Sequence, residues 1–208
     1  PFGGCAMTSR EILYLHGFAS SGASGTVEIL RKEFLGTGAH DRVKVVAPDI
    51  PVDPAEALPM LKALVEREQP ALIVGTSMGA MYAQQFHGFE RICVNPCFTL
   101  SKKYDILHVG KHKWLNRRQD GALEFHVTKD TVRHFEEMEA RQFDGADEID
   151  QLFCHGLFGD EDAICLPERA TFERHYPGCS RLFHGGHRLN AELVHHVLIP
   201  AIRELGIF

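Results

Sequence analysis

The sequence predicts an α/β protein whose mostly parallel sheet is covered by helices on both faces. The alternation of two kinds of segment predicts this class. Short apolar runs, such as residues 11–15 and 71–74, alternate with stretches whose apolar residues recur at a helical period. This alternation is typical of parallel strands joined by crossover helices. The length of 208 residues, with 44% apolar and 24% charged residues, fits one globular domain.

Six strands are predicted, each as a short apolar run bounded by turn residues. They cover residues 11–15, 43–47, 71–74, 91–95, 152–155 and 181–183. Residues 98–128 mix charges, glycines and isolated aromatics and predict no firm element.

Helices are predicted between these strands. The first follows Ser24 as a cap, places Val27, Leu30, Phe34 and Leu35 on one face, and stops at Gly36 and Gly38. Asp53-Pro54-Ala55-Glu56 begins the second, which runs to about residue 69, with Pro59 either kinking it or marking its true start. The others cover residues 77–86, 130–142, 167–176 and 189–205, the last with a disturbance at Pro200.

Charge and hydropathy exclude several classes of protein. The 22 Lys and Arg against 28 Asp and Glu give a net charge of −6, which disfavours a nucleic-acid-binding protein. The longest apolar runs are far shorter than the roughly 18 residues of a membrane span, and the start lacks the layout of a signal peptide. We expect Met7 to be the natural start and residues 1–6 to be extra. Residues 7–208 would then form one domain with a cap or lid-like insertion at about 98–150.

The six cysteines, at positions 5, 93, 97, 154, 165 and 179, include no CxxC pair. Several lie in apolar stretches, which predicts buried free thiols in a reducing, cytoplasmic location.

A nucleophile is predicted at Ser77, within Gly75-Thr76-Ser77-Met78-Gly79. The pattern G-x-S-x-G between a strand and a helix is typical of a nucleophile elbow, a sharp turn that holds the serine clear of the sheet. Glycines are needed at Gly75 and Gly79 because neighbouring chain approaches closely. The backbone amide of Met78 points to the same place as the serine oxygen.

A serine nucleophile needs a base and an acid, which follow it in the chain in the order serine, acid, histidine. The predicted base is His187, beyond the glycine turn of His184-Gly185-Gly186-His187, with His184 as the less favoured choice.

The predicted acid lies in Gly159-Asp160-Glu161-Asp162. Asp160 is preferred, because it comes first after the glycine and has a short side chain. Asp162 is the next choice and Glu161 the last, and Asp162 also suits a helix cap.

An oxyanion hole is predicted from the backbone amides of Met78 and Phe18, since Gly17 lets the early loop turn towards Ser77. His16 is interpreted as structural, hydrogen-bonded beneath that loop. His16, Gly17 and Trp114 are also included as candidate substrate-binding residues.

Five motifs together resemble the α/β-hydrolases, and more narrowly the small YqiA-type esterases. They are Tyr-Leu-His-Gly-Phe at 14–18, Val-Gly-Thr-Ser-Met-Gly at 74–79, Val-Asn-Pro at 94–96, Gly-Asp-Glu at 159–161 and Gly-Gly-His at 185–187. The resemblance implies an α/β-hydrolase fold, Ser77, Asp160 and His187 as catalytic residues, and cleavage of small acyl esters without a cofactor. Residues 98–150 are longer and more charged than this family leads us to expect.

Three alternatives stay open. Residues 111–118 place four cations around Trp114, either as a solvated face or as an anion contact that would suit an acyl-CoA thioester. A metal site formed by His184, His187, His195 and His196 is disfavoured, because no HExxH or CxxC is present and adjacent histidines on a helix diverge. A non-catalytic binding protein with the same fold is the third. We therefore predict a serine esterase or thioesterase that acts on a small molecule and needs no metal; the sequence leaves its oligomeric state open.

Overall fold

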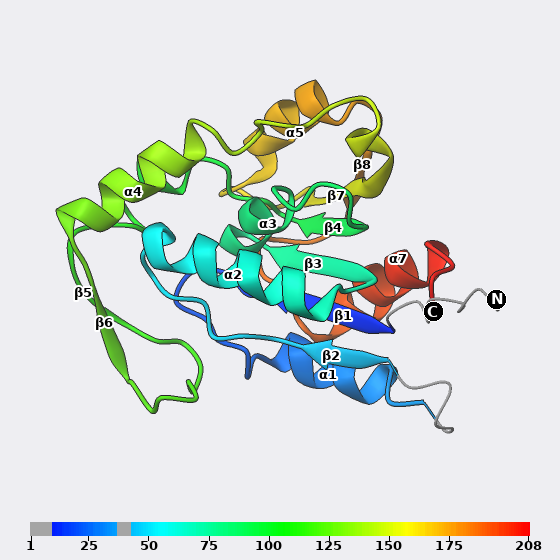
Figure 1. Ribbon diagram of the computed structural model, residues 1–208, viewed down its shortest axis with the longest axis horizontal. Coiled ribbons are helices and arrows are strands. Elements are labelled where there is room, and N and C mark those ends of the chain that lie inside the picture. Colours follow the sequence, from blue (N-terminus) through cyan, green and yellow to red (C-terminus); the bar gives the residue numbers. More distant parts are fainter. Residues whose placement is uncertain (1–9, 37–42) are drawn as a thin grey trace, which may run out of the picture.

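The computed structural model describes residues 10–36 and 43–208. A six-stranded sheet forms its centre, with strand order β2-β1-β3-β4-β7-β8 and every pair parallel (Figure 1). The strands are β1 (Glu11–Leu15), β2 (Lys44–Val46), β3 (Leu72–Thr76), β4 (Arg91–Val94), β7 (Cys154–Gly159) and β8 (Ser180–Phe183). The mostly parallel sheet is thus confirmed, and a strand lies at each of the six predicted places. The bounds of the fifth are corrected: residues 152–153 belong to a 3-10 turn, and β7 continues to Gly159. The expectations about Met7, residues 1–6, Cys5 and Gly38 concern residues outside the described ranges.

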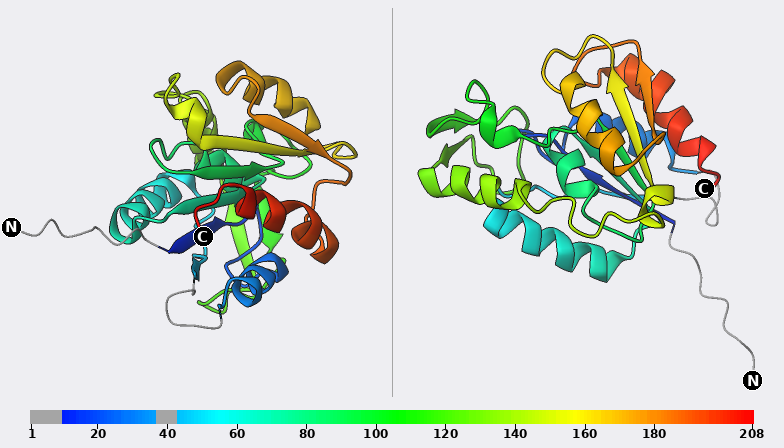
Figure 2. Two further views of the ribbon diagram at one scale, coloured as in Figure 1. Left: turned by 90° about the vertical axis from the view of Figure 1, so that its right-hand side faces the viewer. Right: turned by 90° about the horizontal axis from the view of Figure 1, so that it is seen from above.

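The core has two halves because successive strand side chains point to opposite faces. Leu13, Leu15 and Ile73 face one half, with apolar residues of α2 (Pro54–Glu68), α3 (Met78–Ala83) and α5 (Arg169–His175). Ile12 and Tyr14 face the other, with residues of α1 (Gly25–Glu33) and of the final helix, which ends with α7 (Ile199–Glu204). Figure 2 shows this layering: seen from above, α2 lies on one side of the sheet and α1 and α7 lie on the other.

The predicted helices are present with altered ends. They are α1 (Gly25–Glu33), α2 (Pro54–Glu68), α3 (Met78–Ala83), α4 (Lys129–Glu139), α5 (Arg169–His175) and a final helix built from α6 (Ala191–Leu193), a π-helical turn η4 (Val194–Leu198) and α7 (Ile199–Glu204). Short 3-10 turns lie at η1 (Leu100–Lys102), η2 (Asp150–Phe153) and η3 (Leu166–Glu168).

Two details of the helix predictions are corrected. Leu35 was expected on the buried face of α1, but the helix ends at Glu33 and the Leu35 side chain is exposed. Pro59 lies inside α2 and does not mark its start, since the helix begins at Pro54 with the Asp53 carboxylate accepting from the Ala55 amide. None of the helices within the described ranges is both long and apolar enough to cross a bilayer.

Residues between β4 and β7 contain an antiparallel hairpin that the sequence did not predict. It pairs β5 (Gly110–Lys113) with β6 (Glu124–Val127). β5 contains no apolar residue, and β6 contains only two, Phe125 and Val127. The alternation of apolar and polar residues is therefore too short to predict either strand. Figure 1 shows the hairpin and α4 at the end of the molecule away from both chain termini.

The described cysteines are free thiols: Cys93, Cys97, Cys154 and Cys165 are buried and Cys179 is partly buried. The prediction of unpaired, mostly buried cysteines is confirmed for these five.

Candidate active site

Ser77 lies at the sharp turn between β3 and α3. Its backbone has φ 55° and ψ −117°, which is strained for a residue with a side chain. Close approaches around it leave room only for hydrogen at two positions: a Cβ on Gly75 would lie 2.3 Å from the Gly79 carbonyl oxygen, and one on Gly79 would lie 2.0 Å from that of Leu15. The local geometry is therefore that of the predicted elbow.

His187 follows β8 and reaches back across the sheet to Ser77. Its Nε2 lies 3.0 Å from the Ser77 Oγ, and its Nδ1 lies 2.8 Å from Oδ2 of Asp162. With Asp162 ionised, Nδ1–H donates to the carboxylate, so Nε2 is free to accept the serine proton. These three side chains form one hydrogen-bonded chain of the kind that activates a serine.

Asp162 is buried beneath His187. Its Oδ1 accepts from the amides of Ile164 and Cys165 at 2.8 and 3.0 Å. Burial alone would raise the pKa of the Asp162 carboxyl, but hydrogen bonds from His187 and the two amides hold the pKa below its usual value of 3.8. Asp162 is thus kept as a carboxylate where it can orient the imidazole.

Asp160, the preferred acid from the sequence, does not contact His187, and this expectation is corrected. Its amide donates to the Phe183 carbonyl, and its Oδ1 accepts from the Gly185 amide at 3.1 Å. Its carboxylate also lies 3.2 Å from Nδ1 of His184. A turn in which the Asp162 amide donates to the Gly159 carbonyl carries the chain inwards. The carboxylate two residues further on is therefore the one that reaches the imidazole.

Both predicted oxyanion donors, the backbone amides of Phe18 and Met78, donate to no carbonyl or side chain among the described residues. Gly17 brings its loop against the nucleophile, because a Cβ there would lie 3.3 Å from Cβ of Ser77. Unpartnered amides beside a serine nucleophile are what an oxyanion hole requires.

His16 supports this loop from below. It is 1% exposed, its Nδ1–H donates to the Gly17 carbonyl at 2.8 Å, and its Nε2 accepts from the Ile50 amide at 2.9 Å. Burial lowers the pKa of His16 to about 4, so the imidazole is neutral near pH 7. The structural interpretation of His16 agrees with this geometry. Its inclusion among the substrate-binding candidates does not, since neither ring nitrogen is free.

Trp114 follows strand β5 and packs on the hairpin. The centroid of its ring lies 4.1 Å from that of Phe125 and 3.9 Å from Cζ of Arg118. The hairpin also contacts the Phe18 loop. The Phe18 ring meets those of His112 and Phe125 edge-on, and the Leu115 amide donates to the Ala19 carbonyl at 2.7 Å. The structure therefore connects Trp114 to the Phe18 loop through the hairpin. Contact of Trp114 and of Gly17 with a substrate stays a prediction.

A possible set of metal ligands overlaps the Ser77 site. Asp162, Cys165 and His187 offer ligand atoms within 4.8 Å of one another. Of the four histidines considered from the sequence, only His187 belongs to this group. Its Nδ1 and the Asp162 carboxylate are already hydrogen-bonded at 2.8 Å, so a cation would have to replace that bond.

Comparison with known families adds an independent observation. The model of the Uncharacterised protein family (UPF0227) matches residues 11–142, which is more than half of the chain. The chain belongs to this family. The YqiA-like resemblance is thereby confirmed, and the matched region includes Ser77 and the Phe18 loop but ends before Asp162 and His187.

Solved structures with the same fold include esterases and lipases. Est1E from Butyrivibrio proteoclasticus has a TM-score of 0.63 at 15% identity, covering 96% of this chain and 88% of that one. The Paleococcus ferrophilus monoacylglycerol lipase has a TM-score of 0.57 at 16% identity, covering 94% and 93%. A putative hydrolase from Agrobacterium vitis has a TM-score of 0.62 at 14% identity, covering 94% and 87%. At these identities the likeness establishes the α/β-hydrolase fold.

Proposed function

We propose that this protein is a serine hydrolase that cleaves small carboxylic esters through an acyl-enzyme. The observation that carries the proposal is the unbroken chain of hydrogen bonds from Ser77 through His187 to Asp162. A serine, an imidazole and a carboxylate joined by hydrogen bonds at a strained elbow form the arrangement that acyl transfer needs. The esterase and lipase relatives of the same fold support it.

The first half-reaction would form the acyl-enzyme. The Ser77 Oγ attacks the ester carbonyl carbon while Nε2 of His187 takes its proton, and Asp162 stabilises the resulting imidazolium. The carbonyl oxygen becomes negative and is held by the amides of Phe18 and Met78. Each such donor typically lowers the barrier by about 2.7–4 kcal/mol. The intermediate then collapses, and His187 returns the proton to the departing alcohol.

The second half-reaction would use water in place of the serine. His187 takes a proton from water as the water oxygen attacks the acyl carbon, and then gives it to Ser77 Oγ as the ester bond to the enzyme breaks. The products are a carboxylic acid and free enzyme. Besides the ester and water, these steps use only the chain's own residues.

The test is turnover of a short p-nitrophenyl ester by the purified protein and by Ser77→Ala. We expect the substitution to lower kcat by at least about 10³-fold, because the nucleophile is lost. Thr76→Ser, which changes the neighbouring residue conservatively, is the matched control and should retain activity within about tenfold. Turnover by Ser77→Ala at the wild-type rate would contradict the proposal.

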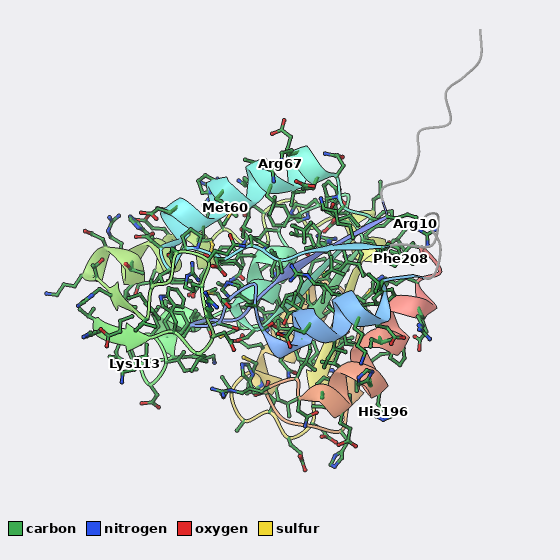
Figure 3. All side chains as sticks on the ribbon, turned by 90° about the horizontal axis from the view of Figure 1, so that it is seen from below. Arg10, Met60, Arg67, Lys113, His196 and Phe208 are labelled. Carbon is green, nitrogen blue, oxygen red and sulfur yellow. The ribbon has the colours of Figure 1, made fainter. Side chains whose placement is uncertain are left out.

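A second candidate is an acyl-CoA or other thioester substrate at the same site. Residues 98–128 contain six Lys and Arg against three Asp and Glu, although the whole chain is acidic. Lys113 and Arg117 are exposed, and no described carboxylate lies within ion-pair distance of either. Figure 3 places Lys113 on the hairpin, remote from Arg10 and Phe208.

These two substrate classes are separated by one comparison. A phosphate-bearing leaving group would gain from Lys113 and Arg117, and a neutral ester would not. If thioesters are the substrates, the double substitution to Gln should raise KM for a short acyl-CoA by about tenfold and leave KM for a p-nitrophenyl ester unchanged. Equal KM values for the acyl-CoA before and after substitution would favour the neutral ester.

A further inference from the structure

The path of the His187 loop requires a support in the middle of its span. Ser77 follows β3, whereas His187 follows β8, and β4 and β7 lie between these strands. Three strand spacings correspond to about 14 Å. The loop must therefore cross the carboxyl ends of β7 and β4 before its imidazole reaches Ser77. Asn95 directly follows β4, at the point where the loop crosses that strand.

The side chain of Asn95 holds the two loops that cross there with three hydrogen bonds. Its Nδ2 donates to the carbonyls of Gly186 and His187 at 3.1 and 3.0 Å. Its Oδ1 accepts from the Gly159 amide at 2.8 Å, at the start of the loop that carries Asp162. Asn95 is 1% exposed, so its side chain makes these bonds from a buried position. One buried amide thus joins the histidine loop to the acid loop.

The backbone around Asn95 also joins it to the serine. The Ser77 amide donates to the Val94 carbonyl at 3.0 Å, and the Cys97 amide donates to the Ser77 carbonyl at 3.2 Å. Asn95 itself has φ +44°, a region in which Asn and Asp are enriched among residues with side chains. The residue type therefore suits both the backbone conformation and the three side-chain bonds.

We propose that Asn95 is a positioning residue that sets the place of His187 relative to Ser77 and Asp162. It touches neither imidazole nor serine side chain in the described contacts, so it acts through the loop backbone. This inference rests on the proposed serine hydrolase function and deepens it. Misplacement of a reacting group by about 1 Å can cost on the order of 10²-fold in rate, so loss of this support should be visible in kcat.

Two substitutions distinguish the role of the Asn95 side chain from that of its backbone conformation. Asn95→Gly keeps the positive φ and removes all three side-chain bonds. Asn95→Asp keeps the shape and the bond from the Gly159 amide, but when ionised it places a carboxylate against the carbonyls of Gly186 and His187. Both variants should lower kcat for a p-nitrophenyl ester by about 10²-fold, with KM within about threefold of wild type.

The matched control is Asn190→Gly, which removes another asparagine side chain close to the same loop. Asn190 caps α6 by accepting from the Leu193 amide at 2.9 Å, and no described bond joins it to Gly186 or His187. Replacing a cap asparagine with glycine lowers the stability of a helix only slightly. Its kcat should stay within about twofold of wild type.

A folding role and a positioning role give different results. All rates are taken per folded molecule, well below the melting temperature of each variant measured by circular dichroism. If Asn95→Gly and Asn95→Asp melt earlier but keep wild-type kcat, Asn95 serves only the fold and the inference is overturned. A loss confined to KM would overturn it as well. If the wild-type protein neither hydrolyses esters nor reacts at Ser77 with a fluorophosphonate, the proposed function fails instead.

Discussion

The loop after β7 and the loop after β8 together form two aspartate–histidine pairs, Asp160–His184 and Asp162–His187. The two pairs differ in burial and in the groups to which they are bonded. Asp160 and His184 are 3.2 Å apart with side chains 45% and 82% exposed. The Asp162 Oδ2 and the His187 Nδ1 are 2.8 Å apart, with side chains 0% and 18% exposed, and the other ring nitrogen of His187 is hydrogen-bonded to Ser77 Oγ. The same two residue types thus make a surface contact at one position and a connected relay at the other.

The environment decides what each pair can do. Water screens the attraction between exposed charges, so the Asp160–His184 pair contributes little beyond holding the loop. The buried carboxylate of Asp162 is fixed by two amides, which leaves one of its oxygens for the imidazole. A fixed carboxylate keeps the imidazole in one tautomer and orientation, which is the requirement for general-base catalysis.

The largest expected difference between the pairs is in catalysis. Asp162→Asn should lower kcat for ester hydrolysis by about 10⁴-fold. The asparagine side chain no longer enforces the tautomer of His187 in which Nε2 is free to accept a proton. Asp160→Asn is the matched control, and its kcat should stay within about tenfold of wild type. Steady-state kinetics of the two variants measure this. Equal losses in both would remove the distinction between the pairs.

A third imidazole, His16, sharpens the comparison because it is buried without a carboxylate partner. Its pKa is lowered to about 4 by burial, against 6.5 ordinarily. Between these pH values the unfolded chain binds a proton that the folded chain does not, so stability falls as pH decreases. The loss from this group between pH 7 and pH 4 is about 3 kcal/mol.

The substitution His16→Gln tests this expectation, since glutamine stays neutral and can still donate to Gly17 and accept from Ile50. Urea unfolding of both proteins at several pH values gives the measurement. The fall in unfolding free energy from pH 7 to pH 4 should be about 3 kcal/mol smaller in the variant. Parallel pH dependences in the two proteins would contradict a buried, neutral His16.

The smallest expected effect is in the titration of the exposed pair. The hydrogen bond that His184 donates to the Asp160 carboxylate raises the pKa of His184 above 6.5. The Gly185 amide, followed by His184, lowers the pKa of Asp160 below 3.8. The contribution of His184 to stability is therefore present below pH 6.5 and is lost as pH rises through its raised pKa. NMR titration of His184 should show its midpoint moving down towards 6.5 in Asp160→Asn. An unchanged midpoint would show that Asp160 exerts no hold on His184.

The fold and two members of the Ser77 site were accessible from sequence because they depend on local patterns. Apolar runs located all six strands, and G-x-S-x-G between a strand and a helix located Ser77. His187 was favoured over His184 because it lies beyond a glycine turn and before the last helix. The structure brings His187 to Ser77, while the catalytic role of each stays a proposal.

The choice between Asp160 and Asp162 could not be made from local pattern. It depends on the direction of the turn after Gly159, which is set by bonds from Asp160 and Glu161 to the distant loop at 183–185. The same limit applies to Asn95. Its motif was noticed only through a family resemblance, because its three partners lie 64 to 92 residues away. Long-range contacts of this kind leave no periodic signal in the sequence.

The most direct measurement of the central claim is covalent labelling with a serine-directed fluorophosphonate followed by peptide mass spectrometry. If Ser77 is activated through His187 and Asp162, the protein should gain one adduct, on the peptide containing Ser77. The labelling rate should fall steeply in Asp162→Asn and hardly change in Asp160→Asn, with no adduct in Ser77→Ala. Folded wild-type protein that hydrolyses no ester and stays unlabelled, or that labels equally fast in Asp162→Asn, would contradict the account.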